Sequence, residues 1–489
     1  METVNGKGQI LDGHIFIYPA DEEELDPHDL LSFMRRNIQY AKDYKHNMQM
    51  YLGNHDILDQ QRRMYGPDNR LVANLPHYIV DTYNGFFTGI PPKITLDDKN
   101  ENEALQQWND TNSFQDKLSE ISKQTDIYGR SFAFIYQDEN ADTCIAYASP
   151  TDAFMVYDDT VARKPFAFVR YWKDTESGLW TGMVYYANKI KTFKGSVVED
   201  SDQNNMYNLV PAVEFYGNEE RQGVFDNVKT LIDELDRVLS QKANQVEYFD
   251  NAYLKILGLD LDEDGDGRPD ANLIGNQMIY SPNADAANAD VEFISKPDGD
   301  NMQEHIIDRL ISMIYQVSMV ANLNDEAFSG NASGVAIKYK LLSMQNQAAV
   351  EERKFRISLR NLLGTVIGMG KVIGTIDKDQ VRKELRFKFN RNIPIDLANQ
   401  AQTARELKGI VSDQTMLSTL DIVDDAKKEM QRIADEQAEQ VKQAVKNSAS
   451  ATDLVKGGNN DEDTQQPQER GLLEGSGTSG TGVDAPKPS

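Results

Sequence analysis

The sequence predicts an α+β protein in which a region of helices and antiparallel strands is followed by long helices and a polar tail. Short β-branched and aromatic segments succeed one another between positions 130 and 195, and no helix-length crossover separates them, which favours antiparallel pairing. Apolar residues keep helical spacing over 224–257 and again over 300–320. From about position 447 large apolar residues become rare, so residues 447–489 are predicted to be a disordered tail.

Composition limits the possible functions. The chain has 489 residues, of which 39% are hydrophobic, and this favours two or more structural domains. Its 78 acidic and 51 basic residues give a net charge of −27, which argues against a general nucleic-acid binder, because nonspecific duplex binding depends on Lys and Arg. The single cysteine, Cys144, excludes an intrachain disulfide and most thiolate metal sites. No secretory signal or membrane span is predicted, so we expect an intracellular protein.

The first half of the chain is predicted to form one mixed domain. Residues 1–26 are expected to be a flexible arm. Amphipathic helices are expected from Pro27 to Gly53, over 74–89 and near 114–128, followed by the strands. Residues 27–223 would therefore form an α+β domain.

The two long helices flank an insert at 258–299, which contains strand candidates at 276–282 and 289–295. A loop of small and polar residues, 321–334, separates the second helix from a third long helix at 335–373. This loop is longer than the usual connection between helices, and such loops tend to be functional. A strand and then short helices are expected over 374–446.

An acidic motif in the insert is similar to a calcium-binding loop. Its carboxylates occupy the first, third, fifth and ninth positions of such a loop: Asp262, Asp264, Asp266 and Asp270. Carboxylates at this spacing can converge on one hard cation, but Leu273 replaces the bidentate Glu of the twelfth position. We interpret the motif as a solvated hairpin tip and predict no metal site. A divalent-cation-binding module remains the alternative function.

No catalytic constellation is evident in the sequence. The segment around Lys371 lacks the first Gly and the final Ser or Thr of a phosphate-binding loop, and it falls within a helical pattern. The six histidines show no metal-ligand spacing. We therefore predict neither enzyme activity nor a cofactor.

The order of several segments resembles tailed-bacteriophage portal proteins of the type found in siphophages of Gram-positive hosts, the gp6-like portal family. The resemblance covers about residues 27–440 and is carried by these segments: 51–58, 69–94, 209–258, 329–342, 387–396 and 412–433. It implies a portal fold. The wing would comprise 27–223 and 335–395, the stem helices 224–257 and 300–320, the small α/β clip 258–299, the tunnel loop 321–334 and the helical crown 396–446.

The resemblance also implies a function. Portal proteins form rings, usually dodecamers, at one capsid vertex, after assembly in the host cytoplasm. Double-stranded DNA is packaged and ejected through the ring. The implied partners are the terminase large subunit, the head–tail adaptor, and the major capsid and scaffolding proteins, with no membrane involved.

Candidate site residues follow from this resemblance. The DNA-facing candidates on and beside the tunnel loop are Asn322, Asn324, Asp325, Glu326, Phe328, Asn331, Lys338 and Lys340. The two lysines would either place positive charge near the channel or solvate the start of the helix. The partner-binding candidates of the clip are Asp262, Asp264, Asp266, Arg268 and Asp270. An acidic channel would leave the duplex mobile, whereas a basic one would bind its phosphates.

Overall fold

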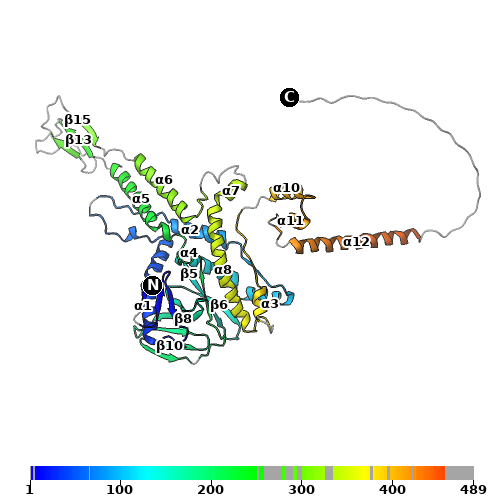
Figure 1. The fold of residues 1–489 in the computed structure, drawn as a ribbon. Helices are drawn as coiled ribbons and strands as arrows, with labels where there is room; N and C mark the ends of the chain where they lie inside the picture. The colour runs from blue at the N-terminus through cyan, green and yellow to red at the C-terminus, as the bar shows by residue number, and fades with distance from the viewer. Residues whose placement is uncertain are drawn as a thin grey trace, which may run out of the picture. The chain divides into compact units, whose positions relative to one another are not determined.

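The structure is a computed structural model with two compact units, Met1–Pro394 and Ile395–Ser489, which we describe separately. It describes residues 2–3, 6–64, 66–201, 203–250, 253–257, 278–281, 290–294, 300–324, 334–374, 378–393, 397–420, 422–423 and 426–456. The first unit mixes helices and sheets as predicted (Figure 1).

The largest sheet of the first unit has eight strands in the order β1-β2-β3-β7-β8-β9-β10-β11. Its strands are β1 Glu2–Thr3, β2 Gln9–Leu11, β3 Ile15–Tyr18, β7 Ala153–Asp158, β8 Pro165–Lys173, β9 Trp180–Tyr185, β10 Ile190–Lys194 and β11 Val197–Asp200. All neighbours pair antiparallel except β3 and β7, which are parallel. The prediction of antiparallel strands is thus confirmed for most of this sheet.

Helix α1 (Pro27–Tyr51) covers one face of this sheet. Asp26 caps its first turn by accepting a hydrogen bond from the His28 amide at 2.8 Å. The fully buried ring of Phe33 lies 5.0 Å from that of Phe16 on β3, and Phe16 in turn lies 4.9 Å from Phe154 on β7. This aromatic stack joins the helix to the centre of the sheet.

A second core lies between a three-stranded sheet and the remaining helices. The sheet has the order β12-β5-β6. The elements are α2 Leu75–Phe87, β4 Lys93–Thr95, α3 Lys99–Thr111, α4 Phe114–Tyr128, β5 Arg130–Gln137, β6 Thr143–Ala148, β12 Ala212–Tyr216, α7 Gly334–Lys340, α8 Leu342–Gly368, α9 Lys378–Glu384 and β16 Arg386–Lys388. Phe355 of α8 packs edge-on against Phe87 and Phe215, each at 5.2 Å between ring centroids. Strand β16 pairs with β4, although the two strands are far apart in the sequence.

Two further helices of this unit form an antiparallel pair: α5 (Lys229–Asp250) and α6 (Asp300–Ser318). The chain between them contributes a three-stranded sheet in the order β14-β13-β15, with β13 at Tyr253–Leu257, β14 at Met278–Ser281 and β15 at Asp290–Ile294. The strand candidates at 276–282 and 289–295 are therefore confirmed.

Three predictions about element boundaries were wrong. The expected flexible arm 1–26 contains β2 and β3, and all four residues of β3 are buried because the strand pairs with β7, far away in sequence. The segment 224–257 is not one helix, since α5 ends at Asp250 and β13 begins the small sheet. The segment 335–373 is divided at Leu341 into α7 and α8.

The helices of the second unit among its described residues are α10 Leu397–Leu407, α11 Asp413–Ser418 and α12 Ala426–Lys456. Ser412 caps α11, because its side chain accepts a hydrogen bond from the Thr415 amide at 3.3 Å. Helix α12 continues beyond position 447, so the predicted start of the disordered tail was wrong. Residues 457–489 lie outside the described part of the chain.

Candidate functional site

Apolar contacts hold the antiparallel pair together near the start of α5 and the end of α6, and polar contacts hold it together nearer the small sheet. Its buried apolar residues are Ile232, Leu235 and Val238 on α5 and Ile307, Leu310 and Ile314 on α6. Nearer the small sheet, Lys242 forms an ion pair with Glu304. There the side-chain Nε2 of Gln303 also donates a hydrogen bond to Gln245 Oε1 at 2.8 Å. The pair therefore joins two tips, the small sheet at one end and the chain that leaves α6, residues 319–324, at the other (Figure 1).

Helix α6 also carries an exposed apolar stripe. Its members share one face of the helix because their spacing is four, seven and four residues. They are Met302 (67% exposed), Ile306 (42%), Met313 (37%) and Val317 (43%). Exposed apolar residues grouped on one helix face are suited to contact with another molecule, although the exposed Arg309 lies among them.

An extended segment lies along α5 and is bound to it by a regular series of hydrogen bonds. The amide of Ala73 donates to Asp236 Oδ1 at 2.7 Å and that of Leu71 to Ser240 Oγ at 2.8 Å. The amide of Asn69 donates to Asn244 Oδ1 at 2.5 Å. Two residues of extended chain advance about 6.6 Å and four residues of helix about 6 Å, so the two repeats match. The sequence analysis missed this contact, although small polar residues four apart on α5 were a visible signal.

A buried pair, His55 and Asp236, fixes the start of residues 56–73, whose last part is the extended segment along α5. His55 Nδ1 lies 2.5 Å from Asp236 Oδ2, and His55 Nε2 lies 3.0 Å from the Met50 carbonyl oxygen. Both ring nitrogens therefore face acceptors, which favours the doubly protonated imidazolium. Burial alone would lower the pKa of His55, but Asp236 and the Met50 carbonyl raise it above its usual value.

This pair predicts a pH-dependent anchor for residues 56–73. Because the pKa of folded His55 exceeds the unfolded value of about 6.5, its stabilisation is complete below that pH and is lost as pH rises through the folded pKa. We expect the amides of Leu71 and Ala73 to lose protection from hydrogen exchange, after correction for intrinsic rates, as pH rises above neutrality. His55→Asn should flatten this dependence. An equal pH dependence in this variant would contradict the role of the imidazolium.

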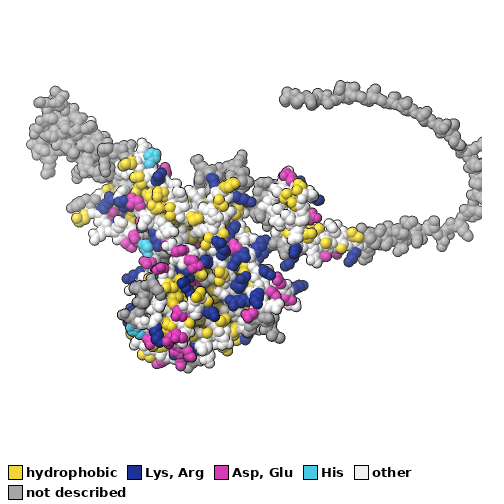
Figure 2. Space-filling view, viewed as in Figure 1, with side chains coloured by type: hydrophobic (Ala, Val, Ile, Leu, Met, Phe, Trp, Pro, Cys, Tyr) yellow, Lys and Arg dark blue, Asp and Glu magenta, His cyan; other side chains and the backbone are white. Residues whose placement is uncertain are grey.

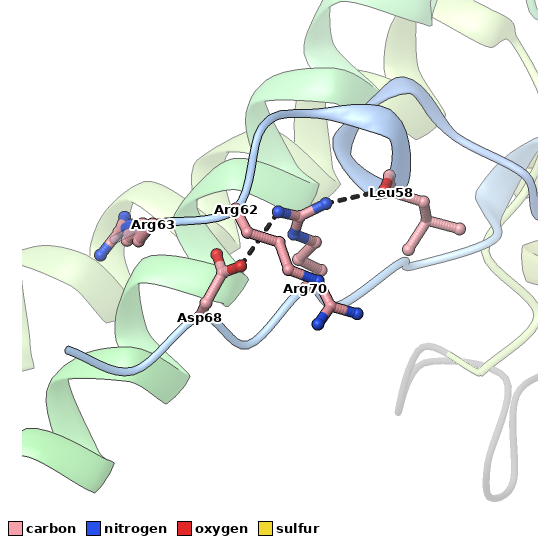
Figure 3. Close-up of a pocket in the computed structure, with 5 residues that line it drawn as sticks. All are labelled: Leu58, Arg62, Arg63, Asp68 and Arg70. Atoms are coloured by element: carbon pink, nitrogen blue, oxygen red, sulfur yellow. Dashed lines mark hydrogen bonds and ion pairs between the residues drawn. The ribbon is translucent and has the colours of Figure 1, made fainter. Parts of the chain in front are cut away.

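Residues 56–73 also carry a cluster of arginines, which surrounds an open hollow of about 590 Å³ (Figure 3). Arg70 is fixed, since its guanidinium donates to Asp68 Oδ2 at 2.9 Å and to the Leu58 carbonyl at 2.8 Å. Arg62 and Arg63 are exposed, and their guanidiniums make no hydrogen bond or ion pair with the residues that the structure describes. The hollow is thus suited to an anionic group, and it is a feature that the sequence analysis did not single out.

Four of the predicted tunnel-loop residues lie within the described part of the chain. Asn322 and Asn324 follow α6, and Asn322 Oδ1 accepts a hydrogen bond from the Asn324 amide at 3.1 Å. The intervening Leu323 amide donates to the Tyr78 hydroxyl on α2 at 2.9 Å, which anchors this end of the loop. On α7, Lys338 is exposed and Lys340 is half-buried.

The other predicted site residues lie outside the described residues. These are Asp325, Glu326, Phe328 and Asn331 of the loop, and Asp262, Asp264, Asp266, Arg268 and Asp270 of the insert.

Basic side chains gather on one surface of the first unit. Figure 2 shows Lys and Arg side chains over the region of α8 and α9. Arg360 of α8 and Arg382 and Lys383 of α9 are exposed and lie together on this surface. Part of this surface is an open hollow of about 500 Å³, where Asp379 supplies a negative charge beside Arg360 and Arg382. In a chain with a net charge of −27, this surface is an exception suited to an anionic partner.

Comparison with known proteins identifies the family. The chain matches the family described as phage portal protein, SPP1 Gp6-like, over residues 33–443. It belongs to this portal protein family. The match spans both compact units and includes the helix pair, the small sheet and the segment along α5.

Two relatives are themselves named portal protein. The chain is 23% identical over 431 residues to the portal protein of Clostridium phage phiCD119, covering 80% of this chain and 90% of that protein. It is 22% identical over 382 residues to the portal protein of Bacillus phage SPP1, covering 73% of this chain and 74% of that protein. Portal proteins of phages are components of the virion capsid and assemble as oligomers. In the described part of this portal protein, no helix combines the length and hydrophobicity needed to cross a membrane.

Proposed function

We propose that this portal protein forms a closed ring, usually a dodecamer in this family, at one vertex of the capsid. Double-stranded DNA would pass through the ring during packaging and again during ejection. The observation that carries the proposal is the antiparallel α5–α6 pair, which joins two separate tips and exposes an apolar stripe on α6. In a ring, each copy presents this stripe to a neighbour through a heterologous contact that closes on itself.

In this proposal the elements have separate tasks. The pair α5 and α6 is the stem, and the insert 258–299 with the small sheet is the clip. The clip would bind the terminase large subunit during packaging and the head–tail adaptor afterwards. The acidic residues between Asp262 and Asp270, with Arg268, would contribute to these contacts. Residues 396–446 would form the crown. Residues 27–223 and 335–395 would form the wing, which meets the capsid and scaffolding proteins.

The tunnel loop 321–334 would face the DNA. Its candidates, Asn322, Asn324, Asp325, Glu326, Phe328 and Asn331, would touch the duplex by shape instead of reading bases. Two of these are acids, which keep the duplex mobile because they do not hold its phosphates. Lys338 is exposed beside the loop and would add a positive charge near the channel. The proposal requires no catalytic step by this chain.

Electron microscopy of the purified full-length chain tests this function first. We expect rings with a central hole. A stable monomer at micromolar concentration and physiological salt would count against the proposal.

A further inference from the structure

A pocket of about 270 Å³ in the first unit brings together two buried carboxyl groups from different helices. Asp126 comes from the end of α4 and Glu351 from the middle of α8, beside Gln347. The remaining wall includes Asn218, which follows β12, and Met319, which follows α6. None of the residues that line this pocket belongs to the acidic motif at 262–270 or to the tunnel loop 321–334.

Four oxygen atoms in this pocket lack hydrogen-bond partners. Asp126 is only 1% exposed, and neither of its carboxyl oxygens is bonded to any described residue. Glu351 is 3% exposed, and its Oε2 accepts from the Tyr83 hydroxyl at 2.8 Å, whereas its Oε1 has no partner there. The buried Oε1 of Gln347 also has no such partner. Buried polar atoms are nearly always bonded, so this group of acceptors is suited to a proton donor, a water or a cation.

Neighbouring cations do not compensate these carboxyl groups fully. Arg391 is engaged mainly elsewhere, since its Nη2 pairs with Glu352 at 2.5 Å and donates to the Ala348 carbonyl at 3.1 Å, while its buried Nη1 has no hydrogen-bond partner among the described residues. Burial and the charge of Glu351 raise the pKa of Asp126 well above its usual range. Burial raises the pKa of Glu351 to about 7, although Tyr83 and Arg391 act to lower it. Protons alone would give these oxygens few donors, whereas one cation can bind several of them.

We propose that this pocket binds a hard divalent cation, Mg²⁺ or Ca²⁺, through Asp126, Glu351 and Gln347, with water as the remaining ligands. Both ions prefer oxygen ligands, and Mg²⁺ in particular is bound by one or two carboxylates while it keeps several waters. The pocket has room for these waters, each of which takes about 30 Å³. No group of three or more His, Cys, Asp and Glu side chains suited to a metal occurs among the described residues, so water must complete the shell.

The cation would connect three elements at the base of the α5–α6 pair. Asp126 lies in the last turn of α4, Glu351 lies on α8, and Met319 begins the chain that leaves α6. Met319 has a φ of +61°, which is costly for a residue with a side chain and shows that its surroundings hold it in place. Binding here would stabilise the folded unit whether or not the chain forms rings.

Thermal unfolding of the full-length chain, stripped of metal with EDTA, tests the proposal. Millimolar MgCl₂ or CaCl₂ should raise the melting temperature by several degrees relative to NaCl of equal ionic strength, because a ligand of the folded state stabilises it. The larger of the two shifts identifies the preferred ion. Glu351→Gln and Asp126→Asn should each abolish most of the shift, while Asp264→Ala in the insert should retain it.

Ion counting makes the result independent of the melting curve. In equilibrium dialysis, Glu351→Gln should bind one ion per chain fewer than the wild type. Asp264→Ala should bind the same number of ions as the wild type. Circular dichroism confirms that each variant is folded. A shift and an ion count that survive Glu351→Gln, or that disappear only with Asp264→Ala, would overturn the proposal. So would the absence of any divalent-specific shift in the wild type.

Discussion

Replacing Glu214 with alanine is expected to destabilise the first unit by about 3–5 kcal/mol, because it leaves the buried Arg130 without its counter-charge and the buried Arg221 with only the exposed Glu219. The Glu214 side chain is 2% exposed, and those of Arg130 and Arg221 are 5% and 7% exposed. Each guanidinium lies 3.4 Å from a Glu214 oxygen, and the Tyr157 hydroxyl donates to the same carboxylate. Arg130 also donates to the carbonyls of residues 13 and 14, so the turn between β2 and β3 depends on this cluster.

The cluster also predicts a response to acid. Burial alone would raise the pKa of Glu214, but Arg130 and Arg221 lower it below its usual value. Its contribution is therefore complete above the unfolded pKa of about 4.3 and is lost as pH falls through the lower folded pKa. The wild type should lose more stability on acidification than Glu214→Ala.

Urea unfolding followed by tryptophan fluorescence measures both effects. The matched control is Glu219→Ala, because Glu219 also pairs with Arg221 but its side chain is 62% exposed. Exposed pairs contribute about 0–1 kcal/mol, so this control should change little. Equal losses in the two variants would show that the buried pairing is not the source of the stability.

A charge on the exposed stripe of α6 is expected to prevent ring assembly. Burying an apolar side chain of this size contributes about 1.5–3 kcal/mol, and an aspartate buried at the same place without a partner is strongly unfavourable. We expect Val317→Asp, and more strongly Ile306→Asp combined with Val317→Asp, to shift the protein from rings to monomers. Each variant should still fold, since both side chains are about 40% exposed in the isolated chain.

Mass photometry at several protein concentrations measures the shift. Leu179→Asp is the matched control, because Leu179 is similarly exposed (47%) but precedes β9 in the large sheet. Rings that persist unchanged in the double variant would exclude the stripe from the subunit contact. Monomers in the Leu179→Asp control would show that the effect of charge is not specific to α6.

The elements that local pattern defines were predictable from the sequence. Helix α1 was recognisable from its apolar spacing after Pro27, and the strands between 130 and 195 were recognisable from their β-branched and aromatic content. Non-local pairing was not predictable. Strand β3 is held by β7, more than a hundred residues later, and no local pattern reveals such a partner. Helix α3 was missed because its polar sequence has few buried residues, Leu105 and Trp108.

The same distinction applies to the functional regions. The helix pair, the insert and the loop after α6 were visible as interruptions in helical periodicity. The pocket of Asp126 and Glu351 was not visible, because its two carboxyl groups are 225 positions apart and nothing in the sequence marks either among 78 acids. The hollow lined by Arg62, Arg63 and Arg70 was not visible either. It depends on the path of residues 56–73, and hydrogen bonds between their backbone amides and side chains of α5 determine that path.

The central claim is that this portal protein closes into a ring around a channel, with α6 at the contact between neighbours. Single-particle electron microscopy of the full-length protein tests it most directly, because it shows both the assembly and the position of α6. We expect closed rings with a central hole, in which Ile306 and Val317 lie against the adjacent subunit. Monomers alone at micromolar concentration, or rings in which the α6 stripe faces solvent, would contradict it.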